Sequence, residues 1–466
     1  MTRNYKEEYQ RWLDSPALSE SEWEELNSIA NDEKEIESRF FAPLEFGTAG
    51  LRGTMKLGLH QMNVHIIRHA TQAFANVIKA EGEEAMKKGI AICFDCRNNS
   101  ELFAHEAACV MAANGIHVRI FDALRPTPEL SFAVRYYGTT AGLNITASHN
   151  PKEYNGYKVY GANGAQIGPD MAQEVTRCIE AVGDFAQVRL MEEDEAAAQG
   201  LLQKIGPEVD EAYFSYVKGL VVDPRVMQAA HAFKVVYTPL HGSGNVPVRR
   251  ILADAGIKEL YVVSEQEAPD GEFPTVSAPN PEARDAFDMA RALAEEKGAE
   301  LLLGTDPDAD RLGAVVRDGG EYVALSGNQI GCIILNYRLK KLSELGLLPE
   351  NGFVVKSIVS TNLANAICAK YGVEIFEVLT GFRYIGEKID ASQRTGEGSF
   401  LFGFEESFGY LAGTRVRDKD AICAALMLTE AAAWYSTRGM NLKQGLDEIF
   451  AQYGYYKEAV QSFTLY

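Results

Sequence analysis

One stretch decides the fold: the apolar run Gly89-Ile90-Ala91-Ile92-Cys93-Phe94, which has the length of a buried strand. A long helical pattern precedes it over residues 64–88, and a second helix is predicted over residues 100–114. The next strand follows at residues 116–121, and Pro126-Thr127-Pro128 opens another helix. Strands that alternate with helices of this length predict βαβ units and a mainly parallel sheet.

The same alternation returns twice more along the 466 residues, which are too many for one core. It follows two short amphipathic helices predicted within residues 1–40, and an acidic, alanine-rich linker is predicted over residues 191–200. We therefore predict an α/β chain of three consecutive, similar units with mixed, mainly parallel sheets. Their boundaries are placed at residues 1–205, 206–321 and 322–440.

Composition limits the functions that the chain can have. With 45 basic and 65 acidic side chains the net charge is −20, which argues against nucleic acid or an anionic membrane as a partner. The polar start does not resemble a signal peptide, and no apolar run approaches the ~20 residues of a membrane span. Seven scattered cysteines, including the Cys93/Cys96 pair, predict reduced and mostly buried thiols. These features predict a cytoplasmic protein, whereas its oligomeric state cannot be read from them.

A serine stands where a strand must turn. The run Ala141-Gly142-Leu143-Asn144-Ile145 reads as a buried strand and leads into Thr146-Ala147-Ser148-His149-Asn150-Pro151. Asn150-Pro151 breaks regular structure, so the Ser148 hydroxyl is expected at a rigid corner, suited to a group that forms and loses a covalent bond. A polar turn with an incidental serine is the alternative interpretation.

An acidic turn follows another apolar strand. Asp306, Asp308 and Asp310 come after residues 299–303, and three carboxylates so close together repel one another unless a cation lies among them. Oxygen ligands suit Mg²⁺, and Arg311 beside them suits an anion that shares the metal. An EF-hand is excluded, because its sixth position would be Arg311 and its twelfth Arg317. A solvated acidic turn remains the other interpretation.

The serine and the acidic turn fit one common site, since a phosphoserine oxygen could complete a Mg²⁺ site built from aspartates. Weaker signals accompany them. A glycine-rich stretch, residues 45–53, places Arg52 where backbone N–H groups could approach a phosphate. Polar loops are predicted at residues 95–100, 380–383 and 403–409, each after a strand.

Taken together, these motifs resemble the α-D-phosphohexomutase family, in its phosphoglucomutase/phosphomannomutase branch. The resemblance spans nearly the whole chain in the family's order, through Phe46–Gly53, Thr146–Pro151, Asp306–Arg311, Glu405–Gly409 and Lys419-Asp420. It implies four domains, of which the first three share one α/β topology around a central cleft.

The resemblance also implies a reaction and its residues. Ser148 would carry a phosphoryl group that passes to a hexose phosphate, so that glucose 1-phosphate and glucose 6-phosphate interconvert through glucose 1,6-bisphosphate. The Ser148 phosphate and the three aspartates would hold Mg²⁺. The remaining implied residues are Arg52 and Arg311 at the transfer site, and Lys158 and Lys419 near the reacting oxygens, with acid–base or charge-stabilising roles. Around the substrate the resemblance implies Thr380, Gly381, Glu405 and Ser407, with Asp310.

Two departures from the family pattern carry expectations. Arg383 stands where relatives often have lysine, which keeps the charge but alters phosphate geometry. The family's fourth domain, with its Arg-x-Ser-Gly-Thr-Glu-Pro loop, does not appear before Tyr466, so residues 441–466 are assigned to a linker or to the start of that domain. We therefore expect metal binding and a formed serine loop, but weak mutase turnover.

Several alternatives stay open at this point. Mannose phosphates are the runner-up substrates, because one hydroxyl orientation separates them from glucose phosphates, and a phosphopentomutase or a sugar-bisphosphate synthase is a lesser option. From other classes, the chain could be a metal-dependent sugar phosphatase or an inactive sugar-phosphate binding protein.

Overall fold

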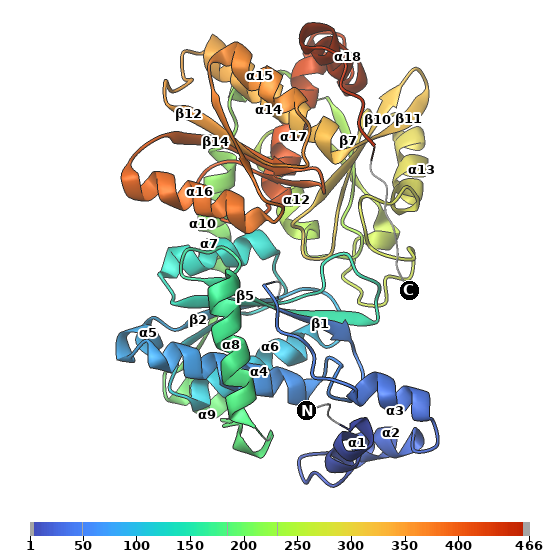
Figure 1. Ribbon diagram of the computed structural model, residues 1–466. Helices are drawn as coiled ribbons and strands as arrows, with labels where there is room; N and C mark the ends of the chain where they lie inside the picture. Colours follow the sequence, from blue (N-terminus) through green and yellow to red (C-terminus); the bar gives the residue numbers. More distant parts are fainter. Residues whose placement is uncertain (1–3, 49, 184, 231, 460–466) are drawn as a thin grey trace. The chain divides into compact units, whose positions relative to one another are not determined.

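The computed structural model describes residues 4–48, 50–183, 185–230 and 232–459 (Figure 1). Contacts divide the chain into two compact units. Unit 1 comprises residues 1–213, 241–243 and 269–279, and unit 2 comprises residues 214–240, 244–268 and 280–466. Each unit is described by itself below, and the domain boundaries and the central cleft expected from the sequence stay predictions.

Unit 1 begins with three helices where the sequence predicted two: α1 (Tyr5–Leu13), α2 (Glu20–Ser28) and α3 (Glu33–Phe40). The third was missed although it has its own N-cap, since the Asp32 side chain accepts the N–H of Glu35. Trp12 of α1 is buried and packs edge-on against Phe40 of α3. Helix α1 is thereby joined to α3 through an aromatic contact, and the Tyr9 hydroxyl donates to Leu26 O of α2 at 2.9 Å.

The sheet of unit 1 has six strands in the order β1-β5-β4-β2-β3-β6. The pairs β2–β4, β2–β3 and β3–β6 are parallel, whereas β1–β5 and β4–β5 are antiparallel. The strands are β1 (Leu51–Thr54), β2 (Ile90–Phe94), β3 (Val118–Phe121), β4 (Ala141–Ile145), β5 (Tyr154–Gly161) and β6 (Leu202–Ile205). The helices of this unit are α4 (Val64–Ala80), α5 (Glu83–Lys88), α6 (Ser100–Ala113), α7 (Thr127–Tyr137), α8 (Pro169–Val182), η1 (Phe185–Gln187) and α9 (Glu193–Ala198).

Two predictions for this unit are wrong. The single helix expected over residues 64–88 is divided at Gly82, whose φ of 101° is incompatible with a continuous helix, into α4 and α5. The linker expected over residues 191–200 contains α9, and β6 follows it in the sheet. Alanine favours helix, and Ala196 is buried against the unit, so tertiary packing orders a stretch that its composition alone marked as a connection.

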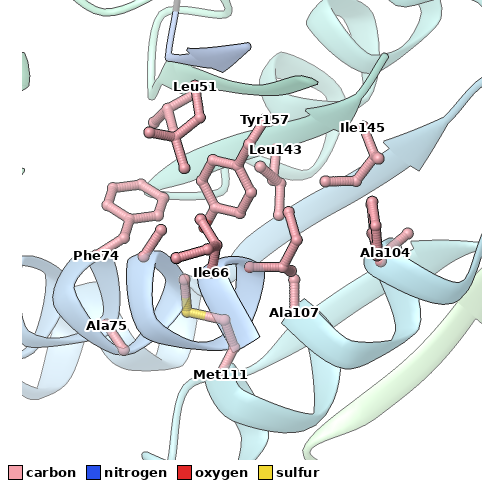
Figure 2. Packing of buried hydrophobic residues seen from close by; sticks show 14 of the residues in the cluster. Leu51, Ile66, Phe74, Ala75, Ala104, Ala107, Met111, Leu143, Ile145 and Tyr157 are labelled. Atoms are coloured by element: carbon pink, nitrogen blue, oxygen red, sulfur yellow. The ribbon is translucent and has the colours of Figure 1, made fainter. Parts of the chain in front are cut away.

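The core of unit 1 lies between the sheet and the helices α4 and α6 (Figure 2). Leu143 of β4 and Tyr157 of β5 point from the sheet toward Phe74 of α4 and Met111 of α6. The opposite face is covered by α7, and Gly142 permits its close approach, because a Cβ there would lie 2.6 Å from a methyl carbon of Val134. At this point β4 packs the large Leu143 toward one helical layer, whereas Gly142 presents no side chain to α7.

Unit 2 contains two further sheets, both mixed. The first has the order β11-β10-β9-β7-β8, with β7 parallel to β8 and β9, and the second has the order β13-β12-β14-β15, with β12 parallel to β13 and β14. The strands are β7 (Lys234–Thr238), β8 (Glu259–Val262), β9 (Leu301–Thr305), β10 (Leu312–Asp318), β11 (Glu321–Leu325), β12 (Gly352–Ser357), β13 (Glu374–Val378), β14 (Ser399–Glu405) and β15 (Gly409–Leu411). The prediction of mixed, mainly parallel α/β sheets is confirmed.

Helices surround these sheets, and the α14–α17 pair packs against the second one. They are α10 (Pro207–Lys218), which begins in unit 1, α11 (Pro224–Ala229), α12 (Asn245–Asp254), η2 (Ser264–Gln266), η3 (Asp285–Phe287), α13 (Asp288–Lys297), α14 (Gly327–Glu344), α15 (Leu363–Tyr371), α16 (Phe382–Thr395), α17 (Ala421–Thr437) and α18 (Leu442–Tyr453). In the part of the chain that the structure describes, no helix is both long and apolar enough to cross a membrane.

In three places the elements observed in unit 2 differ from those predicted from the sequence. Tyr322 was placed at the start of the third predicted unit, but it lies in β11, which pairs with β10 in the first sheet of unit 2. The loop expected at residues 403–409 is shorter, because β14 continues through Glu405. Residues 442–453, assigned to a linker or to the start of a fourth domain, form α18, in which Leu446 and Ile449 are buried. This helix packs on α14 and α17.

All seven cysteines are free thiols, as the sequence predicted. Four are buried and three are half-buried. Burial raises the pKa of the Cys96 thiol and that of the Cys93 thiol.

A buried charged cluster joins α11, α14 and α17 in unit 2. The Asp223 carboxylate accepts a hydrogen bond from Arg225 Nε at 2.8 Å and lies 3.2 Å from Lys341 Nζ. The Glu430 carboxylate accepts the N–H groups of Val222 and Asp223. The bonds from Arg225, and then Lys341, lower the pKa of Asp223 from 3.8 to about 2. The folded state therefore favours the ionised form of this carboxylate.

Leu143→Ala should destabilise unit 1 by about 3 kcal/mol, since it deletes a fully buried side chain from a packed core. Urea unfolding followed by tryptophan fluorescence measures this in a Trp434→Phe background, in which the remaining tryptophans, Trp12 and Trp23, both lie in unit 1. The control is Leu102→Ala, which truncates an exposed leucine and should cost less than about 0.5 kcal/mol. Equal effects of the two substitutions would contradict this description of the core.

Asp223→Asn should lower the free energy of unfolding by about 2 kcal/mol at pH 7. A carboxyl whose pKa falls on folding contributes stability above its unfolded pKa, and that stability is lost as the pH falls from 3.8 toward about 2. Urea unfolding followed by circular dichroism at pH 7 and pH 3 should show the effect halved at the lower pH. Asp447→Asn, at an exposed pair with Lys443, is the control and should change little at either pH.

Candidate active site

Ser148 lies in the loop between β4 and β5 of unit 1, as the sequence predicted. Its backbone is in the left-handed region with φ of 52°, which is uncommon for a residue other than glycine. Its side chain is almost fully buried, and its Oγ lies 3.1 Å from Nδ1 of His149. Its N–H donates to Thr146 Oγ1 at 2.8 Å. The hydroxyl is therefore fixed at a corner that is itself held by hydrogen bonds.

Asp95, at the carboxyl end of β2, holds this loop through a hydrogen bond with Thr146. Its carboxylate accepts hydrogen bonds from Thr146 Oγ1 at 2.6 Å, from Ser100 Oγ at 2.7 Å and from the Arg97 N–H at 2.9 Å. Burial raises the pKa of Asp95, and Arg97 with the two hydroxyls opposes that rise. The sequence analysis predicted a polar loop at residues 95–100 after a strand, but missed its connection to the serine loop.

Arg52 and Lys158 lie on the two strands nearest the loop. Arg52 is exposed on β1 and donates from Nη1 to Asn150 Oδ1 at 3.2 Å, so the glycine-rich stretch reaches the serine loop. Lys158 is buried on β5, opposite Asn144 of β4. Arg52 and Ser148, two of the predicted site residues, are thus brought together within unit 1.

The acidic turn joins the antiparallel strands β9 and β10 in unit 2. Asp306 Oδ1 accepts the N–H groups of Asp310 and Arg311 at 3.1 and 3.0 Å, which fixes the turn. Asp306, Asp308 and Asp310 are all buried, and one carboxylate oxygen from each lies within 4.8 Å of the others. Three converging hard oxygen donors fit a divalent cation such as Mg²⁺.

Two cations flank this turn. Lys419 Nζ lies 3.0 Å from Asp310 Oδ2 and 3.6 Å from Asp418 Oδ1. Burial alone lowers the pKa of Lys419, but Asp310 and Asp418 outweigh it and the pKa is raised overall. Arg311 contacts Glu282 through Nη1 at 2.5 Å. The Lys419 ammonium therefore stays protonated and suits charge stabilisation rather than proton abstraction.

The loop of residues 406–408 lies beside the acidic turn. The N–H of Leu312 donates to Phe408 O at 3.1 Å, and Arg311 pairs with Gly409 in an isolated antiparallel bridge. The Lys419 stem crosses Gly409, where an added Cβ would lie 2.4 Å from Lys419 Cδ. Backbone contacts within unit 2 thus bring together two predicted motifs that are about 100 residues apart in sequence.

Glu405 and Gly381 meet at the end of β14. The Gly381 N–H donates to Glu405 Oε1 at 2.7 Å. Burial raises the pKa of Glu405, and the Gly381 N–H and Lys419 oppose that rise. Ser407 is half-buried and Thr380 exposed. The loop expected over residues 380–383 is shorter than predicted, because α16 already begins at Phe382.

The sequence analysis overlooked Glu406, between Glu405 and Ser407. Its carboxylate accepts hydrogen bonds from Ser357 Oγ at 2.8 Å and Ser360 Oγ at 3.1 Å. Ser357 ends β12 and Ser360 follows it, and polar residues at the end of a buried strand were the available signal. The contact fixes the loop to the second sheet of unit 2.

Comparison with known proteins assigns the chain to a family. Residues 43–184, 211–320 and 326–453 match the family models described as phosphoglucomutase/phosphomannomutase, alpha/beta/alpha domains I, II and III. The chain belongs to the phosphoglucomutase/phosphomannomutase family.

Relatives support this assignment across most of the chain. A phosphoglucomutase of Staphylococcus epidermidis is 38% identical over 454 residues, which cover 97% of this chain and 80% of the relative. A phosphoglucomutase of Staphylococcus aureus is 37% identical over 93% of this chain and 76% of its own length. A solved Thermus thermophilus structure described as a phosphomannomutase is 25% identical with a TM-score of 0.71, covering 89% of this chain and 84% of that one.

Asp308→Asn should weaken divalent-cation binding by at least about tenfold, because it replaces one of three converging carboxylates with a neutral amide. Mn²⁺, a spectroscopic substitute for Mg²⁺, can be titrated and its free fraction read by electron paramagnetic resonance. Glu295→Gln removes an exposed carboxylate of α13 and serves as the control, with unchanged affinity expected. An unchanged dissociation constant in Asp308→Asn would remove this turn as the metal site.

Proposed function

We propose that this chain is a Mg²⁺-dependent phosphohexomutase that interconverts glucose 1-phosphate and glucose 6-phosphate through a phosphoserine at Ser148 and glucose 1,6-bisphosphate. The observation that carries the proposal is the buried triad of aspartates beside the protonated Lys419. It occurs in a chain that is 36–38% identical to proteins named phosphoglucomutase. This combination suits transfer of a dianionic group.

In the proposed reaction, the phosphoryl group passes from Ser148 to the free hydroxyl of a hexose monophosphate. The bond between phosphorus and Ser148 Oγ breaks, a bond to the sugar oxygen forms, and the hydroxyl proton passes to Oγ. The bisphosphate then returns its other phosphoryl group to Ser148 by the reverse step. The left-handed backbone at Ser148 supports this role, because strained residues held by their surroundings are common at functional sites.

The acidic residues of unit 2 are proposed to hold Mg²⁺, with the phosphoserine as a further ligand. Asp306, Asp308 and Asp310 supply oxygen atoms, the donor type that Mg²⁺ prefers. When bound, the ion would supply positive charge against the transferring phosphoryl group. The hydrogen bonds that Asp306 accepts from its own turn orient this carboxylate before any ion binds.

Cationic side chains are proposed to stabilise the charge of the phosphoryl group. Arg52 and Arg311 present guanidinium groups, which suit phosphate oxygens. Lys419 is held protonated by Asp310 and Asp418, so we assign it to charge stabilisation. Lys158 is proposed to act in the same way.

The sugar is proposed to contact the loops of residues 380–381 and 405–407. Glu405 and Ser407 provide acceptors for adjacent hydroxyls, and Thr380 is exposed for contact with the far side of the sugar. The Gly381–Glu405 hydrogen bond links these two loops. Mannose 1-phosphate is the alternative substrate, favoured by the structural likeness to the Thermus thermophilus protein.

The cytoplasm is the proposed location. Seven free thiols suit a reducing compartment. Hexose phosphates are metabolites of that compartment, so the proposed substrates agree with it.

Coupled assays with glucose 1-phosphate and mannose 1-phosphate, each primed with its bisphosphate, test the proposal. We expect glucose 6-phosphate as the main product. Ser148→Ala should reduce the rate by more than about 10³-fold, because it removes the group that carries the phosphate. Intact-mass spectrometry should detect one added phosphate in the parent chain and none in this variant.

Ser215→Ala changes an exposed serine of α10 and is the matched control, expected to keep full activity. Free phosphate as the main product would identify a phosphatase instead. Binding of the sugar phosphates without phosphorylation of Ser148 would identify a binding protein. A rate typical of the family would overturn the weak turnover expected from the sequence.

A further inference from the structure

Residues 269–279 form a segment that we call the strap. It lies within the sequence matched to family domain II, at residues 211–320, yet its contacts place it in unit 1 together with residues 241–243. The N–H of Asp270 donates to His241 O at 3.3 Å, and His241 Nε2 lies 2.9 Å from Thr275 Oγ1. The strap is therefore attached through Asp270 and Thr275 to His241, in the segment of residues 241–243 that also belongs to unit 1.

The strap packs directly on Arg97. The Phe273 ring is buried, and its centroid lies 5.1 Å from Arg97 Cζ, within the range of a cation–π contact. Phe273 itself has a φ of 46°, a left-handed conformation that its surroundings must maintain. The strap thus uses an unfavourable backbone conformation at the residue whose ring covers the guanidinium group.

Glu272 and Gly271, which precede Phe273, hold the strap against Asn98 and Lys152. Glu272 accepts hydrogen bonds from Asn98 Nδ2 at 2.6 Å and from Lys152 Nζ at 2.8 Å. Lys152 directly follows residues 146–151, which carry Ser148. Glu272 therefore links that segment to Asn98, the residue next to Arg97. Gly271 allows close approach, because a Cβ there would lie 2.5 Å from the backbone nitrogen of Asn98.

Arg97 connects the strap to the serine loop through hydrogen bonds. Its guanidinium donates to Ser148 O at 2.6 Å, to Pro151 O at 2.9 Å and to Tyr154 O at 3.1 Å, and also to Asn150 O. The side chain is fully buried. One planar group therefore holds several carbonyl oxygens of the loop and fixes the peptide at which Ser148 adopts positive φ.

We propose that the strap is a positioning element for Ser148, which it orients through Phe273 and Arg97. This inference rests on the proposed function, in which the Ser148 oxygen exchanges a phosphoryl group. Phosphoryl transfer needs the attacking and leaving oxygens in line, so a small rotation of the loop lowers the rate of transfer. Phe273 and Arg97 touch no reacting atom in this scheme and act only through the loop backbone.

Phe273→Leu tests the proposal, because it keeps an apolar side chain over Arg97 but removes the aromatic face. We expect faster amide hydrogen exchange at residues 146–151 and phosphorylation of Ser148 by glucose 1,6-bisphosphate about tenfold slower. Gly271→Ala should produce the same pair of changes by displacing the strap. The rate is expressed per folded molecule, with the folded fraction taken from circular dichroism.

The matched control is Phe376→Leu, which removes a different cation–π contact, with Lys388 in unit 2. It should leave both the exchange of residues 146–151 and the phosphorylation rate unchanged. If Phe273→Leu alters neither measurement, or speeds exchange without slowing phosphorylation, the strap does not position Ser148 for transfer.

Failure of the proposed function gives a different result. In that case the parent chain itself acquires no phosphate at Ser148. The exchange measurement still decides whether the strap orders the loop.

Discussion

A charge removed from water must be compensated, and this constraint governs the buried charges of both units. In unit 1 the buried carboxylate of Asp95 has Arg97 and two hydroxyl donors around it. In unit 2 the buried aspartates have Lys419 and Arg311 beside them and the backbone N–H groups of their own turn. Unpaired ions in such surroundings would cost several kcal/mol each. The same pairing that permits burial also fixes each side chain in a single orientation.

The sequence predicted the features that depend on local pattern. The apolar run of residues 141–145 followed by Asn150-Pro151 was enough to place Ser148 at a strand-to-loop corner. The acidic triad after a buried strand was likewise found where expected, at the end of β9. Both predictions rest on a local pattern, an apolar strand followed by a polar turn. The assigned roles of the individual residues stay predictions.

Features that depend on distant partners could not be predicted in this way. Arg97 has no periodic signal, because its partners are carbonyl oxygens about 50 residues later in the chain. The segment of α18 was assigned to a linker or to the start of a fourth domain, because nothing within residues 441–453 indicates the surface against which it packs. The turn at Gly82 was missed because one glycine within a helical pattern is common, and only the backbone angle shows that the helix ends there.

The strap has a consequence for the order in which the protein is made. The six-stranded sheet of unit 1 is complete at Ile205, but the contacts over Arg97 come from residues 269–279. During synthesis, a nascent chain can therefore assemble this sheet while the segment that covers its serine loop is still inside the ribosome. The loop would acquire its final restraint only after about 70 more residues have been added. The first folded part of the protein thus stays unfinished until the middle of the chain emerges.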